Sequence, residues 1–280
     1  MIDNLAFFLE NHSFELPAWE TLPGEEIQPS PDIMGKRFDV LYHLAKINEP
    51  KIVIAPLQSV LQKVITKEEL ILLCYTWKKK DTISFDEVPL ILTQLGYKRS
   101  PVVSDKGQFA VRGGIIDIFP VSSADAYRVE FFGDEIDNIR TFDPIGQKSI
   151  AKVDQFFFTP ADEPLVLSQS KLSSVLDYLG ENTLIVFDGI VHLEDAYVKL
   201  KEMPGMKSRL MLSIDEMLNA FKKYQCLFFS EEMLEMLTEE GAAAKEAITF
   251  EIFNKTYQSQ RFFHKFHTIE SFYLHDESEG

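Results

Sequence analysis

The hydrophobic pattern of this chain changes twice along its 280 residues. Residues 1–77 alternate helical and strand patterns, residues 78–160 carry mainly strand patterns, and residues 161–280 return to the alternation. Alternating helices and strands are typical of an α/β layer architecture. Because a β-rich stretch interrupts the alternation, the sequence predicts an α/β domain that is split in the chain by an inserted β-rich domain.

In the first flanking stretch, helical and strand signals follow one another closely. Residues 32–45 place apolar side chains at helical spacing, with Asp32 as the candidate N-cap. Residues 52–55 form a short apolar run, which predicts a buried parallel strand. Residues 59–63 then begin a second helical pattern, so this stretch has the order expected of an α/β unit.

The second flanking stretch shows the same alternation. Residues 168–179 predict a helix that Gly180 closes in a left-handed conformation. Residues 183–187 predict a buried strand, and residues 213–224 predict a helix that opens on a capping box. Residues 226–229 predict a further strand.

The middle stretch predicts paired strands. Residues 109–119 read as one strand in which Gly113-Gly114 marks a bulge or a close approach of another backbone. Residues 127–132 and 135–142 alternate apolar and polar side chains on either side of Gly133-Asp134. A Gly-Asp pair between alternating runs predicts a β-hairpin, because glycine readily takes the positive φ that tight turns need.

Composition excludes several classes of function. The formal charge of −16 argues against a broad basic face that would hold nucleic acid by neutralising its phosphates. Cys74 and Cys226 are too few for a disulfide framework and suit a reducing compartment. The first residues lack the charged start of a signal peptide, and no apolar run approaches the roughly 18 residues of a membrane span. We therefore expect a cytoplasmic protein without a membrane segment.

The sequence offers no clear catalytic centre. Nucleotide hydrolysis on an α/β fold needs the run Gly-x-x-x-x-Gly-Lys-Ser/Thr to wrap and contact the phosphates, and this run is absent from the 280 residues. Asp134-Glu135 and Asp188 imitate a magnesium-binding strand end, but Asp134 falls in the predicted hairpin turn and Asp188 lacks a following Glu. We therefore expect no catalytic residues and no cofactor.

A cluster of histidines near the end of the sequence is the one candidate metal site. His264, His267 and His275 lie with Glu270 among aromatic residues. Imidazoles beside a carboxylate can bind zinc, but the aromatic neighbours favour packed, structural histidines. We predict no metal site.

The middle stretch presents residue types that are typical of protein interfaces. Arg112, Arg128 and Phe132 lie in or beside predicted strands, and Arg and Phe are enriched where proteins bind partners. On a regular strand Arg128, Glu130 and Phe132 point to one face. This face predicts an interaction surface, but these residue types alone do not name the partner.

Longer motifs resemble a known family. The runs that carry the resemblance to the bacterial transcription-repair coupling factors are residues 16–23 (LPAWETLP), 30–33 (SPDI), 53–56 (VIAP), 112–120 (RGGIIDIFP), 127–143 (YRVEFFGDEIDNIRTFD) and, more loosely, 182–186 (NTLIV). The runs at 112–120 and 127–143 are shared with the excinuclease subunit UvrB, whereas those at 16–23 and 30–33 resemble the coupling factors alone. The resemblance is strong over residues 16–160 and weak beyond them.

The resemblance implies the fold and the partner. It implies an N-terminal UvrB-homology module, in which a degenerate helicase-like (RecA-type) α/β domain is formed by residues 1–77 and 161–280. The inserted β-rich (α+β) domain, residues 78–160, is then the UvrA-binding domain, with Arg112, Arg128 and Phe132 at positions that contact UvrA. In that family the module recruits UvrA to stalled RNA polymerase, and it has lost ATPase activity.

The resemblance also sets the expected extent of the activity. Coupling factors are several times longer, so we expect a fragment, a dissected domain or a split gene product whose first strand and loop would precede Met1. RNA polymerase and DNA would be bound only by parts that are absent here. Two alternatives stay open: a residual nucleotide- or DNA-binding domain, and an autoinhibitory structural module in which the UvrA-binding face is masked.

Overall fold

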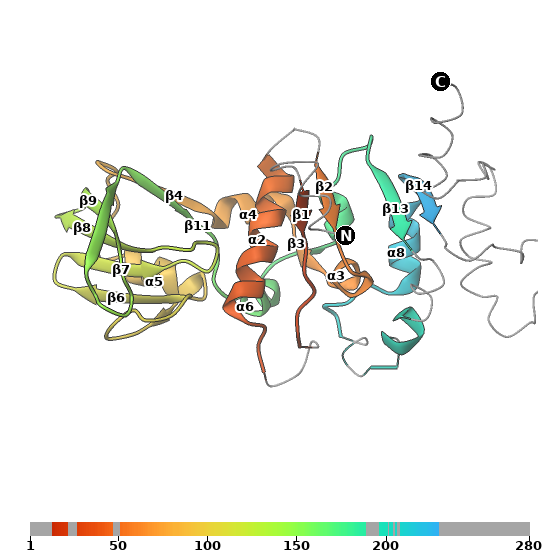
Figure 1. The fold of residues 1–280 in the computed structure, drawn as a ribbon, viewed down its shortest axis with the longest axis horizontal. Helices are drawn as coiled ribbons and strands as arrows, with labels where there is room; N and C mark the ends of the chain where they lie inside the picture. The colour runs from red at the N-terminus through yellow and green to blue at the C-terminus, as the bar shows by residue number, and fades with distance from the viewer. Residues whose placement is uncertain are drawn as a thin grey trace, which may run out of the picture. The chain divides into compact units, whose positions relative to one another are not determined.

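A computed structural model describes residues 13–21, 27–46, 51–188, 196–200, 202–203, 205 and 208–229. Mixed helices and strands place the chain in the α/β class, as the sequence predicts (Figure 1). Within these residues, no helix is both long and apolar enough to cross a bilayer.

Short strands and helices form the part of the chain that flanks the β-rich segment. In chain order they are β1 (Ser13–Glu15), α2 (Pro31–Lys46), β2 (Ile52–Ile54), α3 (Leu57–Leu61), β3 (Val64–Ile65), α4 (Lys67–Leu73) and, after the β-rich segment, α6 (Glu163–Gln169), β12 (Leu172–Ser173), the 3-10 helix η1 (Val175–Tyr178), β13 (Leu184–Asp188), α8 (Ile214–Phe221) and β14 (Gln225–Phe229). The pairs β1–β2 and β13–β14 are parallel, whereas β3 and β12 pair antiparallel across the two flanking stretches. The pairing of β3 with β12 brings the two flanking stretches together in space.

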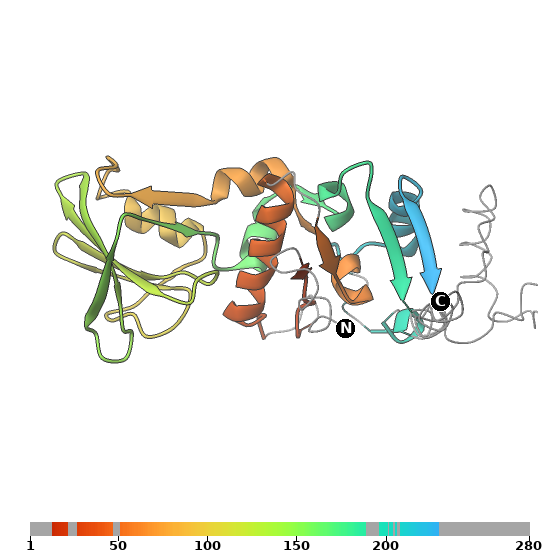
Figure 2. The ribbon, with the colours of Figure 1, turned by 45° about the horizontal axis from the view of Figure 1, so that its top comes forward.

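The β-rich segment is built on one twisted sheet. Its elements are β4 (Tyr75–Lys78), α5 (Val88–Gln94), β5 (Lys98–Arg99), β6 (Gln108–Arg112), β7 (Ile115–Phe119), β8 (Ala126–Phe132), β9 (Glu135–Phe142), β10 (Ser149–Val153) and β11 (Gln155–Phe158). Six of them form the order β10-β9-β8-β7-β6-β5, and β4 pairs antiparallel with β11 beside this sheet (Figure 2).

One face of the six-stranded sheet carries the main core. Alternate residues of its central strands point inward, and they pack against apolar residues of α5, β4 and β11; the buried members are Trp77, Val88, Leu92, Leu95, Tyr97, Phe109, Ile116, Ile118, Val121, Val129, Ile136, Ile139, Phe156, Phe158 and Ala161. Trp77 of β4 meets the rings of Phe156 and Phe158 edge to face. Because this face is covered, the opposite face of the sheet is the one available to a partner.

Several local predictions are confirmed. Helix α2 covers the predicted residues 32–45, and the predicted hairpin is β8 and β9 joined at Gly133, whose φ is 60°. The capping box before α8 forms as predicted, because the Ser213 amide donates to the Glu216 carboxylate and the Glu216 amide donates to Ser213 Oγ. The strand predicted at 226–229 lies within β14.

Other local predictions are wrong. Residues 168–179 do not form one helix, since α6 ends at Gln169 and β12 and η1 follow. Gly180 does not adopt a left-handed conformation. The N-cap of α2 is Ser30 rather than Asp32, because Ser30 Oγ accepts a hydrogen bond from the Ile33 amide. The leucines and valines after residue 170 have helical spacing, but Leu172 and Ser173 pair with β3 as a β-strand instead.

The strands predicted to be buried are only partly so. Strand β2 is parallel, as predicted, but Ile52 is exposed. In β13 the side chain of Phe187 is buried, whereas Leu184 and Val186 are about half exposed. Within the described residues each of these strands has one strand neighbour.

The prediction of one strand over residues 109–119 is also wrong. Gly113-Gly114 is the turn between β6 and β7, with Gly113 at a φ of 58°. The predicted close approach does occur at Gly114, because a Cβ there would lie 3.1 Å from the Phe131 carbonyl oxygen.

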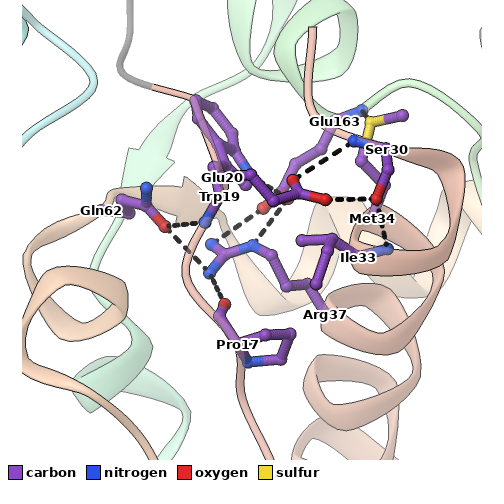
Figure 3. Close-up of polar contacts among 9 residues, drawn as sticks. All are labelled: Pro17, Trp19, Glu20, Ser30, Ile33, Met34, Arg37, Gln62 and Glu163. Carbon is purple, nitrogen blue, oxygen red and sulfur yellow. Dashed lines mark hydrogen bonds and ion pairs between the residues drawn. The ribbon is translucent and has the colours of Figure 1, made fainter.

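A buried ion pair joins the two flanking stretches (Figure 3). Arg37 of α2 donates from Nε and Nη2 to the two carboxylate oxygens of Glu163, at 2.7 and 3.1 Å. Both side chains are essentially inaccessible to solvent. A buried ion pair is tolerated only when further hydrogen bonds satisfy its remaining donors and acceptors.

Those further hydrogen bonds involve the segment before α2 and Gln62, the C-cap of α3. Trp19 Nε1 donates to Glu163 at 2.7 Å, and Arg37 Nη1 donates to the Pro17 carbonyl at 2.8 Å and to Gln62 Oε1 at 3.2 Å (Figure 3). Gln62 Oε1 also accepts from the Trp19 amide. Four separate parts of the chain therefore meet at one polar cluster, which we call the Arg37–Glu163 cluster: Pro17, Trp19, Arg37, Gln62 and Glu163.

Glu163→Gln should destabilise the protein strongly. The substitution leaves the Arg37 charge buried opposite a neutral amide, and breaking a buried pair from one side costs about 3–5 kcal/mol. Asp32→Asn is the matched control, because it breaks the exposed Lys106–Asp32 pair of the same helix and should cost at most about 1 kcal/mol. Urea denaturation measures both, and equal losses would contradict the importance of the buried pair.

Helix α2 also makes a close backbone contact at Gly35. A Cβ at this position would lie 2.1 Å from the carbonyl oxygen of the buried Val121, which follows β7. Gly35 therefore allows α2 to approach the β-rich segment.

Gly35→Ala should lower the thermal midpoint. Replacing glycine by alanine inside a helix normally stabilises a protein by as much as about 1 kcal/mol. Here the added methyl group collides with backbone atoms and should destabilise the protein by about 1–3 kcal/mol. Gly180→Ala is the control, because nothing lies within 4 Å of its Cβ position. A midpoint for Gly35→Ala equal to or above that of the parent would contradict the contact.

Candidate partner-binding face

The outer face of the six-stranded sheet contains all three residues predicted to bind a partner. Register pairs Arg112 with Ile115, Ile115 with Glu130, and Asp117 with Arg128, so these side chains share one face. Half of this face is closed by a small apolar cluster: Val103, Ala110, Ala126 and Phe142, with Phe119 packed against it. The other half, towards the two glycine turns, is the candidate partner-binding face.

A buried carboxylate lies at the centre of this face. Asp117 of β7 accepts from Arg128 Nε at 2.7 Å and from Arg128 Nη2 at 2.9 Å, and it also accepts from Arg112 Nη2. The Asp117 side chain is fully buried, whereas those of Arg128 and Arg112 are 16% and 46% exposed. In this Arg112–Asp117–Arg128 triad, side-chain exposure therefore increases from Asp117 through Arg128 to Arg112.

Arg128 is held from two sides. Its guanidinium forms the forked pair with Asp117 and lies over the ring of Phe142, 4.8 Å from the ring centre. The hydrogen bonds that Arg128 donates to Asp117 raise the pKa of Arg128 above its ordinary value. Arg128 is thus charged and held in place, with two of its five N–H groups donating to Asp117.

Adjacent phenylalanines on β8 point to opposite faces. Phe131 points inward against Phe85 and Trp77, whereas Phe132 is 84% exposed on the outer face. The register shifts opposite them, since Glu130 pairs with Asn138 and Phe131 with Ile136, leaving Asp137 of β9 without a partner residue on β8. The irregularity is on β9, so β8 keeps the alternation that the sequence predicts.

Polar neighbours on β9 hold Glu130. Its carboxylate accepts from Asn138 Nδ2 at 3.2 Å and lies 3.4 Å from Arg140 Nη2. The outer face therefore carries paired charges around an exposed aromatic ring. This combination suits recognition of a protein surface, where an apolar anchor is surrounded by polar contacts.

Two other groups that could have chemical roles have structural surroundings in the described part of the chain. Asp134 lies in the β8–β9 turn and accepts a hydrogen bond from the Phe85 amide at 3.0 Å, so its role there is to hold a neighbouring loop. Burial raises the pKa of the Cys74 thiol to about 12, which makes it a poor nucleophile. Among the described residues no group of three or more His, Cys, Asp or Glu side chains could hold a metal ion. His264, His267, Glu270 and His275 lie outside the described residues.

Sequence reasoning missed Asp117. The structure places it between Arg112 and Arg128, yet the sequence analysis singled out only the two arginines and Phe132. The signal was present, because a single carboxylate inside the apolar run Ile115-Ile-Asp-Ile-Phe119 must find a cationic partner when it is buried.

The β-rich segment defines the class of this protein. Residues 76–163 match the family model described as the UvrB interaction domain. The chain is similar to the transcription-repair coupling factors over part of its length, and its resemblance to their N-terminal module is confirmed.

Individual relatives show the extent of this similarity. The chain is 35% identical over 147 residues to the transcription-repair-coupling factor of Haemophilus influenzae, covering 52% of this chain and 13% of the relative. It is 32% identical over 161 residues to that of Escherichia coli K12, covering 58% and 14%. With that of Staphylococcus aureus USA300 it shares 29% identity over 242 residues, covering 84% and 18%. The matches thus span less than a fifth of each of these relatives.

Phe132→Ala and Arg128→Ala should differ in their effect on stability. Phe132 is exposed, so its removal should change the free energy of unfolding by less than about 0.5 kcal/mol. Removal of Arg128 leaves the buried Asp117 carboxylate with one cation and should cost about 3 kcal/mol. Urea denaturation distinguishes the two, and a large loss for Phe132→Ala would contradict the orientation of β8.

Proposed function

We propose that this chain is the UvrA-binding module of a transcription-repair coupling factor. The observation that carries the proposal is that the segment matching the UvrB interaction domain, residues 76–163, presents Phe132 and Arg112 on an uncovered sheet face. The module links RNA polymerase stalled at a lesion to nucleotide excision repair by recruiting UvrA.

The three predicted residues take different roles in this proposal. Phe132 is the apolar anchor, because an exposed aromatic ring contributes large contact area at the centre of an interface. Arg112 supplies a half-exposed cation for a charge-assisted hydrogen bond. Arg128 contacts UvrA with the small part of its guanidinium that remains exposed.

The rest of the chain supports this face. We propose that residues 1–77 and 161–280 form a degenerate helicase-like α/β domain that residues 78–160 interrupt. The parallel pairs β1–β2 and β13–β14 and the contact of β3 with β12 support this division. The module does not hydrolyse ATP in this proposal, and other parts of a full-length cytoplasmic coupling factor bind RNA polymerase and DNA.

Titration calorimetry against purified UvrA tests the proposal. The parent chain should bind, and Phe132→Ala should weaken binding about tenfold or more, or roughly 1.4 kcal/mol. Ile145→Ala is the matched control, because Ile145 is a large apolar residue of the same segment that is 93% exposed. It should bind as the parent does.

Two results would overturn the proposal. The first is a folded parent chain, verified by circular dichroism, that does not bind UvrA. The second is an equal loss of affinity in Phe132→Ala and Ile145→Ala, which would mean that the contact is a general apolar adhesion and not this face.

A further inference from the structure

The Arg112–Asp117–Arg128 triad has an uneven division of contacts. Asp117 gives both carboxylate oxygens to Arg128, and one of them also accepts from Arg112 Nη2. One buried anion between two guanidiniums leaves a net charge of +1. Arg128 is paired with Asp117 through two nitrogens and stacked on Phe142, whereas Arg112 donates from one nitrogen and is half exposed. Arg112 is therefore the residue that presents the uncompensated positive charge to solvent.

Arg112 is placed where a partner that covers Phe132 would reach it. Arg112 directly precedes the Gly113-Gly114 turn, and Phe132 directly precedes the Gly133-Asp134 turn. Strands β6 to β9 are successive antiparallel neighbours, so both turns lie at the same end of the sheet. The Phe131 amide donates to the Gly114 carbonyl at 2.8 Å, which holds these two ends together.

We propose that Asp117 is a positioning residue for partner binding, which fixes the Arg112 guanidinium so that its remaining N–H groups face a carboxylate of the partner. The inference rests on the proposed function and adds the chemistry of the contact. A guanidinium pairs with a carboxylate through two parallel hydrogen bonds only in a limited range of orientations. Holding Arg112 through one nitrogen before binding removes the entropy loss of ordering a long side chain, an advantage of about three- to tenfold in affinity.

Asp117→Asn separates positioning from simple attraction. The substitution removes one negative charge, so long-range attraction of an acidic partner should increase. If Asp117 positions Arg112, affinity for UvrA should instead fall by about three- to tenfold, through faster dissociation, with no decrease in the association rate. Surface plasmon resonance measures both rates.

Asp125→Asn is the matched control. Asp125 is an exposed residue just before β8, and the change in charge is the same. Its carboxylate makes no contact with either arginine of the triad. Asp125→Asn should bind as the parent does.

Nitrogen-15 spectra of the arginine side chains add a measurement on the free protein. The Arg112 Nη signals should be broadened or separated in the parent and in Asp125→Asn. In Asp117→Asn they should be averaged by rotation of the guanidinium.

Arg112→Lys keeps the test decisive if Asp117→Asn does not fold. It leaves the forked Asp117–Arg128 pair intact and retains a positive charge. A lysine cannot bind Asp117 and a partner carboxylate in one plane, so Arg112→Lys should lose affinity nearly as far as Arg112→Ala.

The outcomes separate the two claims. If the parent does not bind UvrA, the proposed function fails and the positioning role fails with it. If the parent binds and Phe132→Ala does not, but Asp117→Asn or Arg112→Lys binds as tightly as the parent, the positioning role is overturned while the proposed function stands.

Discussion

The buried ion pair between Arg37 and Glu163 is the interaction on which the arrangement of the described chain depends. Glu163 opens α6, at the point where the chain leaves the β-rich segment, and Arg37 lies in the middle of α2, more than 120 residues earlier. Desolvating two charges is costly, so the pair is stable only because Trp19, Gln62 and the Pro17 carbonyl complete its hydrogen bonds. The pair therefore fixes the position of these segments, because residues from four separate parts of the chain satisfy its two charges. This gives a physical reason for the run Leu16-Pro-Ala-Trp19, whose backbone and indole both serve the cluster.

A buried carboxylate paired with arginine also occurs on the outer face of the sheet, but there the charges do not cancel. At Asp117 one carboxylate serves two arginines, and the second arginine is half exposed. In the Arg37–Glu163 cluster the two charges neutralise each other and both are buried. In the Arg112–Asp117–Arg128 triad one positive charge is unmatched and faces solvent beside an exposed phenylalanine. A chain with a formal charge of −16 repels an acidic partner at long range, and it can bind one only through a local excess of positive charge of this kind.

The sequence predicted what local rules decide. The β8–β9 hairpin, the extent of α2 and the capping box of α8 each depend on residues within a few positions of one another, and each is confirmed. The errors arose where distant contacts decide. Residues 172–173 lie within the run whose apolar residues have helical spacing, but they pair with β3, about 108 positions earlier in the chain. Gly113-Gly114 fits a bulge as well as a turn, and only the pairing of β6 with β7 distinguishes them. The half exposure of β2 and β13 likewise depends on which strands lie beside them, which an apolar run does not specify.

The candidate face was predicted in part for the same reason. Alternation along β8 is local, and it placed Arg128 and Phe132 on one face correctly, with Glu130 between them. The different environments of these residues are set by distant parts of the chain, because Arg128 is held by a carboxylate on β7 and a ring on β9, whereas the Phe132 side chain is 84% exposed. In the proposed interface, stability and recognition are therefore separable at Phe132 but coupled at Arg128. Removal of Arg128 would remove the proposed partner contact and would also release Asp117, and through Asp117 it would release Arg112. For this reason, substitutions of the half-exposed Arg112 and of Asp117 test the proposed recognition more directly than a substitution of Arg128 on β8.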